Sequence, residues 1–346
     1  MNYRRLGSTG LKVSEFALGS WTTLGGSVDE AATTRIVHRA FELGVNFFDT
    51  ADVYVRGAAE RALGAALRDL PREQIVVATK VMGRVWDGPL GAGLSRKHIF
   101  DAMDQSLKRL GLDYVDLYQA HAPDKDTPIE ETLEAFEDLV RAGKARYLGF
   151  SNFDRDPALA RRAVAYQKRC GWSRFVSSQP RYSLVDRHIE QGHLAFCHAH
   201  GIGLIVYSPL AQGVLTNKYA GGAVPAGSRA SGKFAHFLTL EKALTPENVA
   251  AAERFAAWVA KRGGPTCSQV ALAWVLRRPE VSSAIIGATS VEQLEENLKA
   301  GEMKLSEAEW KEVEGAIAGT LARAVKTPKR ASKRPAKRAG GARRRR

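Results

Sequence analysis

Eight short apolar runs recur along this chain, and the segments between them carry apolar residues at helical spacing. The first seven runs follow one another about every 30 residues, which is the spacing of strand–helix units. Such alternation predicts an α/β protein whose strands lie parallel in one sheet. The predicted strands begin near Phe16, Asn46, Ile75, Val115, Arg146, Phe175, Gly203 and Ser283.

Eight strand–helix units in about 300 residues fit a closed (β/α)8 TIM barrel better than a doubly wound sheet. A doubly wound dinucleotide-binding sheet usually carries GxGxxG after its first strand, and this chain has no such motif there. The opening residues "YRRLGSTGLKVSE" predict a β-hairpin that covers the lower end of the barrel. Helices are expected at 29–43, 60–70, 95–110, 128–141, 157–167 and 187–198, with glycine after three of them, at Gly44, Gly111 and Gly143.

The interval before the last strand is much longer than the others. It holds a loop rich in Gly, Ala and Ser at 212–234, a predicted helix at 246–261, and the apolar segment "CSQVALAWVLRR" at 267–278. A long loop without secondary structure of its own is usually functional. We therefore expect 212–234 to contribute to a binding site.

The basic residues are concentrated at one end of the chain. Of the 51 Lys and Arg residues, 12 lie in 321–346 with no acid among them, which leaves 39 against 37 acidic residues in 1–320. The terminal segment offers almost nothing to bury, so we expect it to be disordered. This divides the chain into a barrel domain at 1–320 and a basic tail at 321–346.

Several classes of protein are disfavoured by what the sequence lacks. No apolar stretch has the length of a signal peptide or a membrane span, so we expect a cytoplasmic protein. Cys170, Cys197 and Cys267 are widely spaced and lack the CxxC grouping of zinc and redox sites, which indicates inert buried thiols and no metal.

Four titratable side chains stand at the ends of consecutive predicted strands, where the active site of a (β/α)8 barrel lies. Asp49 ends the second strand and leads to Tyr54, Lys80 ends the third, and His121 ends the fourth. A phenol donates a proton at neutral pH only when a nearby cation stabilises the phenolate, and Lys80 can supply that cation. Asp49 would keep the lysine charged, and the His121 ring could orient a carbonyl oxygen. Singly, such residues are more often solvated or structural, but together they indicate a tuned proton donor.

The sequence resembles the aldo-keto reductases over residues 3 to about 318. The resemblance is carried, in order, by "FFDTADVY", "VVATK", "DLYQAH", "GFSNF", "SSQPRYSL", "VYSPLAQGVLTNKY", "SRAS" and "IIGATSVEQLEEN". It is strongest to the branch that includes the potassium-channel β-subunits and bacterial aldehyde reductases. The resemblance implies NADPH-dependent reduction of aldehydes or ketones, with Asp49, Tyr54, Lys80 and His121 as the catalytic tetrad. Steroid double-bond reductases of the family carry Glu, and channel β-subunits Asn, where this chain has His121.

The resemblance also implies how a nicotinamide dinucleotide is held. Ser151, Asn152 and Gln179 match the residues that grip the carboxamide, and Tyr207 matches the aromatic ring that stacks on the nicotinamide. Small residues and backbone N–H groups after Tyr207 would follow the pyrophosphate. The full cofactor-binding set is Ser20, Trp21, Asp49, Ser151, Asn152, Gln179, Tyr207, Ser208, Pro209, Leu210, Gln212, Gly213, Lys218, Arg229, Gly287, Thr289, Gln293, Glu296 and Asn297.

Cofactor preference and substrate contacts are less directly encoded. Most of the family holds the 2′-phosphate with a lysine near 287 and an arginine near 293, where this chain has Gly287 and Gln293. The resembled branch uses the arginine of "SRAS" instead, so we expect NADP(H), with Arg229 as the deciding cation. Trp21 and Trp86 follow the first and third strands, where aromatic walls would suit a pocket for an apolar carbonyl compound. Ordinary packing explains Trp86 almost as well.

Two other functions remain open from the sequence. The tail "TPKRASKRPAKRAGGARRRR" could bind a nucleic acid or another polyanion through phosphate contacts, without sequence preference. A non-catalytic subunit that senses NADPH is the other alternative. The physiological substrate and the oligomeric state are not specified by any motif.

Overall fold

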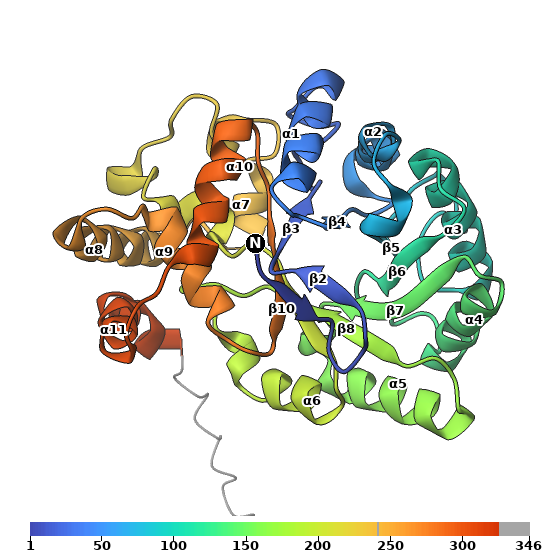
Figure 1. The fold of residues 1–346 in the computed structure, drawn as a ribbon. Helices are drawn as coiled ribbons and strands as arrows, with labels where there is room; N and C mark the ends of the chain where they lie inside the picture. Colours follow the sequence, from blue (N-terminus) through green and yellow to red (C-terminus); the bar gives the residue numbers. More distant parts are fainter. Residues whose placement is uncertain (241, 325–346) are drawn as a thin grey trace, which may run out of the picture.

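The fold is a closed barrel of parallel strands surrounded by helices (Figure 1). The computed structural model describes residues 1–240 and 242–324. Within them eight strands form the barrel in the order β10-β3-β4-β5-β6-β7-β8-β9, which confirms the predicted (β/α)8 architecture. The barrel strands are β3 (Phe16–Gly19), β4 (Phe47–Asp49), β5 (Val76–Val81), β6 (Val115–Ala120), β7 (Ala145–Ser151), β8 (Phe175–Gln179), β9 (Gly203–Val206) and β10 (Val281–Ile286).

Each barrel strand is followed by a helix of the outer ring. Apolar residues on the inner face of these helices pack on the outward side chains of the strands, as Phe136 packs on Phe175. The ring consists of α1 (Glu30–Glu42), α2 (Ala58–Leu67), α3 (Arg96–Leu110), α4 (Ile129–Arg141), α5 (Pro157–Cys170), α6 (His193–Ala199), α9 (Cys267–Leu276) and α10 (Val291–Leu298). Three further helices lie outside the repeat, namely α7 (His236–Leu240), α8 (Pro246–Arg262) and α11 (Glu307–Ala324).

The helix expected at 187–198 is shorter than the sequence indicated. A 3₁₀ turn, His188–Glu190, comes first, and α6 begins only at His193. Gly192 between them has φ 111°, a left-handed conformation that a continuous helix does not contain. The sequence pattern did not predict this break, because leucine, phenylalanine and histidine keep helical spacing on its C-terminal side.

The N-terminal hairpin closes one end of the barrel, as predicted. Strands β1 (Tyr3–Arg5) and β2 (Lys12–Ser14) pair antiparallel, and the hairpin crosses the barrel opening in Figure 1. Leu6 and Val13 are fully buried and pack with Phe47 and Leu117, which belong to the same buried cluster. Fully burying one such side chain contributes about 1.5–3 kcal/mol. The carboxyl ends of the strands lie at the opposite end of the barrel.

The long segment between β9 and α7 consists mainly of short 3₁₀ turns and loops. It contains 3₁₀ turns at Ala211–Thr216, Ala220–Gly222 and Arg229–Ser231 before α7 begins. This confirms a long loop at 212–234. Trp21 after β3 packs against Phe237 of α7, with ring centroids 4.9 Å apart, so the segment returns to the strand ends.

The predicted boundary between barrel and tail falls within a helix, and the division itself stays a prediction. Helix α11 continues to Ala324, beyond the expected boundary at 320. The rest of the predicted tail, 325–346, lies outside the described residues. No helix within the described part of the chain is long and apolar enough to cross a membrane.

Candidate active site

The predicted tetrad meets at the carboxyl ends of β4, β5 and β6. Asp49 is the last residue of β4, Lys80 is the penultimate residue of β5, and His121 directly follows β6. Tyr54 begins a 3₁₀ turn, Tyr54–Gly57, in the loop after β4. Parallel strands bring such residues together because their carboxyl ends share one end of the barrel.

Lys80 and Asp49 form a buried ion pair. Lys80 Nζ lies 2.6 Å from Asp49 Oδ1 and also donates to the carbonyl oxygen of Thr50 at 2.7 Å. The side chain of Lys80 is fully buried. Burial lowers the pKa of Lys80 below its usual value, and the carboxylate of Asp49 opposes that shift. Asp49 therefore helps to keep the buried amine protonated.

Tyr54 lies between this ion pair and His121. Lys80 Nζ lies 3.3 Å from the Tyr54 hydroxyl and donates a hydrogen bond to it. The rings of Tyr54 and His121 meet edge to face with centroids 5.5 Å apart. Burial, followed by the Lys80 ammonium, lowers the pKa of His121 to about 3, so its imidazole is neutral at physiological pH. A neutral imidazole keeps one N–H as a hydrogen-bond donor.

The backbone after Tyr54 is strained. Val55 and Arg56 have φ 48° and 54°, and a β-branched residue such as Val55 rarely adopts a positive φ. Strain of this kind persists where the surrounding structure imposes it, and it concentrates at functional sites. The turn places Tyr54 beside Lys80.

The residues expected at the carboxamide lie together beside the tetrad. Gln179 Nε2 donates to Asp49 Oδ2 at 2.9 Å, and Ser151 Oγ donates to the Gln179 carbonyl oxygen at 2.7 Å. The Tyr207 hydroxyl donates to Asn152 Oδ1 at 2.9 Å. Asn152 Nδ2 donates to the His121 carbonyl oxygen at 2.9 Å and to Ser151 Oγ at 3.0 Å, which connects these four residues with the tetrad.

The loop after β9, where the pyrophosphate residues were predicted, forms a compact turn. Ser208, Ala211, Gln212 and Gly213 all have positive φ, from 47° to 96°, so the backbone turns tightly. Within the turn, the N–H of Ala211 donates to the Ser208 carbonyl oxygen and the N–H of Gly213 donates to the Leu210 carbonyl oxygen, both at 2.9 Å. Predicted Pro209 and Leu210 lie in the same turn.

The cations of Lys218 and Arg229 and the buried side-chain amide of Gln212 lie beside this turn. A Cβ on Gly213 would lie 2.6 Å from Lys218 Cε, so only glycine allows Lys218 its position. Partial desolvation, followed by the charge of Arg229, lowers the pKa of Lys218. Gln212 Nε2 is buried without a hydrogen-bond partner among the described residues. A phosphate would satisfy both the amide and the cations.

Arg229 crosses from this loop to the residues after β3. Its Nη1 donates to Gln212 Oε1 at 3.2 Å, and its Nη2 donates to Thr22 Oγ1 at 2.9 Å. Its guanidinium also lies 4.8 Å from the ring centroid of Trp21. The neighbouring Ser20 donates from Oγ to Thr50 Oγ1 at 2.8 Å, which links β3 to the residue that holds Lys80.

The predicted adenosine residues lie in α10 and in the loop just before it. The backbone N–H of Thr289 donates to Gln293 Oε1 at 2.8 Å, and Ser290 caps the helix. Asn297 is 3% exposed, and its Nδ2 has no partner among the described residues. Gly287 and Glu296 complete the predicted set in this part of the fold.

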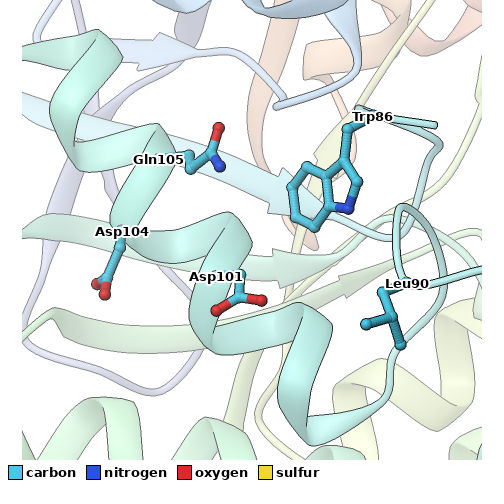
Figure 2. A pocket seen from close by; sticks show the side chains of 5 residues that line it. All are labelled: Trp86, Leu90, Asp101, Asp104 and Gln105. Atoms are coloured by element: carbon cyan, nitrogen blue, oxygen red, sulfur yellow. The ribbon is translucent and has the colours of Figure 1, made fainter. Parts of the chain in front are cut away.

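Trp86 does not join the tetrad. Its ring packs against His98 of α3 with centroids 4.8 Å apart. It lines an open groove of about 380 Å³ with Leu90 from its own loop, and Figure 2 shows the α3 side chains opposite, Asp101, Asp104 and Gln105. Trp21, which contacts Arg229 and α7, is the predicted pocket tryptophan that lies beside the cofactor-binding residues.

A buried acid next to the tetrad was missed by sequence reasoning. Asp52 is 1% exposed, and neither carboxyl oxygen has a hydrogen-bond partner among the described residues. Burial, followed by the charge of Glu60, raises the pKa of Asp52 well above its usual value. Asp49 is the carboxylate in direct hydrogen-bond contact with Lys80 Nζ, at 2.6 Å. Thr50 and Thr22 were missed because their roles depend on a backbone carbonyl and a loop conformation.

Comparison with known proteins agrees with this geometry. The family described as the Aldo/keto reductase family matches residues 15–318. A probable voltage-gated potassium channel subunit beta of Oryza sativa subsp. japonica is 39% identical over 305 residues, which cover 87% of this chain and 91% of that protein. A putative subunit of the same kind from Schizosaccharomyces pombe is 40% identical, over 87% of this chain and 88% of its own length. L-glyceraldehyde 3-phosphate reductase of Escherichia coli K12 is 37% identical, over 87% of each chain. With a matched domain that spans the whole barrel and a tetrad assembled at its mouth, the chain belongs to the aldo/keto reductase family.

Proposed function

We propose that this protein is an NADP(H)-dependent reductase of aldehydes or ketones. The proposal depends mainly on one observation, the Tyr54 hydroxyl 3.3 Å from a buried ammonium that is itself paired with a carboxylate. This arrangement favours proton donation from a phenol, because the ammonium stabilises the phenolate that is left. Membership of an oxidoreductase family and a relative named as a reductase support the same reading.

Each tetrad residue has a role that its environment supports. A bound nicotinamide dinucleotide supplies the hydride that adds to the carbonyl carbon. Tyr54 donates a proton to the carbonyl oxygen, and Lys80 stabilises the resulting phenolate. Asp49 holds Lys80 in its charged form, and the neutral ring of His121 donates a hydrogen bond that orients the carbonyl oxygen.

The preference for NADP(H) over NAD(H) rests on Arg229 and Lys218. These cations stand beside a left-handed turn and an unsatisfied amide, which suits the phosphates of a dinucleotide. Arg229 also has a planar fork of donors that matches a phosphate monoester such as the 2′-phosphate. Gly287 and Gln293 offer no charge at the adenosine end.

Replacing Arg229 with Ala should weaken NADPH binding about 10- to 100-fold, the loss of one or two charge-assisted hydrogen bonds. NADH binding should change much less, because NADH lacks the 2′-phosphate. Titration of both cofactors against the wild type and Arg229→Ala measures the difference. The matched control is Arg84→Ala, an exposed loop arginine beside Trp86. Equal losses for both cofactors would contradict a 2′-phosphate role.

A screen of carbonyl compounds tests the activity itself. The compounds should include 4-nitrobenzaldehyde and L-glyceraldehyde 3-phosphate, the compound in the name of the Escherichia coli relative. Each is assayed with NADPH and NADH side by side. Turnover of any of them would distinguish a reductase from a non-catalytic NADPH-sensing subunit. That alternative remains because the plant and yeast relatives are named as potassium channel subunits.

The basic tail favours a second, separate role in binding polyanions. It carries 12 Lys and Arg and no acid in 321–346, whereas the rest of the chain is nearly neutral. Such a segment binds phosphate backbones by releasing counterions, without reading sequence. It has no aromatic residue to stack on bases, so we propose contact with duplex phosphates and none with base edges.

Removing residues 325–346 should abolish binding to duplex DNA and leave reductase turnover unchanged. The cut follows Ala324, the last residue of α11, so the helix is retained. With six or more phosphate contacts, the affinity of the full chain should fall about 10³-fold between 50 and 200 mM salt. Equal DNA binding by both chains, or affinity that does not depend on salt, would contradict the proposal.

A further inference from the structure

The side chain of Asn152 lies between two parts of the candidate site that come from different strands. Its Nδ2 donates to the carbonyl oxygen of His121 at 2.9 Å, just after β6. Its Oδ1 accepts from the hydroxyl of Tyr207 at 2.9 Å, just after β9. Nδ2 also lies 3.0 Å from Ser151 Oγ, on β7. One amide thus links three strand ends.

The orientation of this amide follows from its partners. A backbone carbonyl oxygen can only accept, so the NH₂ group must face His121 and the oxygen must face Tyr207. The Tyr207 hydroxyl can then donate to Asn152 while it accepts from Arg155 Nη2 at 3.4 Å. The network is self-consistent in one orientation only.

The backbone of Asn152 supports this placement. The residue has φ 61° and ψ 14°, in the left-handed region, which asparagine tolerates better than most residues. Its N–H donates to the carbonyl oxygen of Gln179 at 3.2 Å, so β8 holds the conformation. Glycine could adopt the same conformation without the side chain.

We infer that Asn152 is a positioning residue that couples the ring of Tyr207 to the strand end that carries His121. The inference rests on the proposed function, in which the Tyr207 ring stacks on the nicotinamide and His121 orients the substrate carbonyl. The hydroxyl anchor fixes the tilt of the Tyr207 ring, and the same amide fixes the His121 backbone. The distance between the nicotinamide stacked on Tyr207 and the carbonyl group oriented by His121 is therefore set by the side chain of Asn152.

A double-mutant cycle tests this coupling. Tyr207→Phe removes only the hydroxyl, and Asn152→Gly removes the amide while keeping the backbone conformation. Tyr207→Phe should raise the dissociation constant for NADPH about five-fold, the loss of one neutral hydrogen bond. Asn152→Gly should raise it further and also lower kcat, because the His121 carbonyl oxygen loses its hydrogen bond from Asn152. The double variant should lose less affinity than the sum of the two single losses, because the hydroxyl has already lost its acceptor in Asn152, although its 3.4 Å contact with Arg155 remains.

The matched control is Tyr3→Phe, which removes a hydroxyl bonded to the Gly44 carbonyl oxygen in the N-terminal hairpin region. It should leave NADPH affinity and kcat unchanged. A parallel cycle of thermal midpoints without cofactor should show the same non-additivity between Asn152→Gly and Tyr207→Phe.

Additive effects in either cycle, with NADPH binding of the wild type intact, would overturn the coupling. So would a loss in Asn152→Gly confined to the KM for cofactor with kcat unaffected. Failure of the proposed function gives a different result, since the wild type would then bind no dinucleotide or bind it without turnover.

Discussion

Replacing Tyr54 with Phe should lower kcat about 10²- to 10⁴-fold, the usual contribution of a positioned general acid. The phenyl ring keeps its edge contact with His121, so the pocket retains its shape. The Lys80 ammonium loses one acceptor and keeps Asp49 Oδ1 and the Thr50 carbonyl oxygen. Turnover of 4-nitrobenzaldehyde at saturating NADPH measures the effect.

NADPH affinity and the thermal midpoint are the controls for Tyr54→Phe. Both should stay close to the wild type, since the phenol is assigned to proton transfer and the dinucleotide is held by other residues. An unchanged kcat in a folded, cofactor-binding variant would remove Tyr54 from the mechanism. Matching losses of kcat and affinity would instead indicate that the hydroxyl acts in binding.

Replacing Lys80 with Met should reduce turnover about as much as Tyr54→Phe does, and it should also destabilise the fold. Removing one partner of a buried ion pair costs about 3–5 kcal/mol, because the other charge stays buried. Gln179 Nε2 still donates to Asp49, which partly compensates. Unfolding by denaturant and steady-state kinetics measure the two effects.

The matched control is Lys97→Met, which breaks an exposed pair with Asp101 at the same 2.6 Å separation. An exposed pair contributes about 0–1 kcal/mol, so this variant should keep its stability and its activity. A Lys80→Met variant with the turnover of the wild type would contradict the role of the ammonium.

Replacing Asp49 with Asn should change how the activity depends on pH. Burial lowers the pKa of Lys80, and Asp49 raises it back. In Asp49→Asn the pKa of Lys80 should therefore fall further, and the lysine should lose its proton at a lower pH. Since activity needs the ammonium, the alkaline limb of the kcat/KM profile should move to lower pH than in the wild type.

The barrel and its tetrad were predictable from the sequence because both depend on strand periodicity. Each strand carries an apolar run, so its end could be found within a residue or two, and the positions of Asp49, Lys80 and His121 followed from those ends. Their catalytic roles stay a prediction. The hairpin was predictable because Gly and polar residues separate two short alternating segments. Tyr54 was placed correctly because a short loop leaves little freedom.

The features that sequence patterns missed depend on loop conformation or on long-range contacts. Asp52 lies in the same loop as Tyr54 yet points into a buried layer near Glu60, and nothing in the residue order distinguishes the two directions. Trp86 was assigned to the pocket from its place after β5, but its loop turns outward onto α3. Gly192 breaks a helix whose flanking residues keep helical spacing.

Transfer of isotope from the cofactor to the product tests the account most directly. The wild type is incubated with 4-nitrobenzaldehyde and NADPH that carries deuterium at one of the two C4 positions of the nicotinamide, and the alcohol is analysed by mass spectrometry. Hydride transfer inside one fixed site predicts one deuterium in the alcohol from one of the two labelled cofactors and none from the other. An alcohol without deuterium from either cofactor, or no consumption of NADPH with any carbonyl compound, would contradict it.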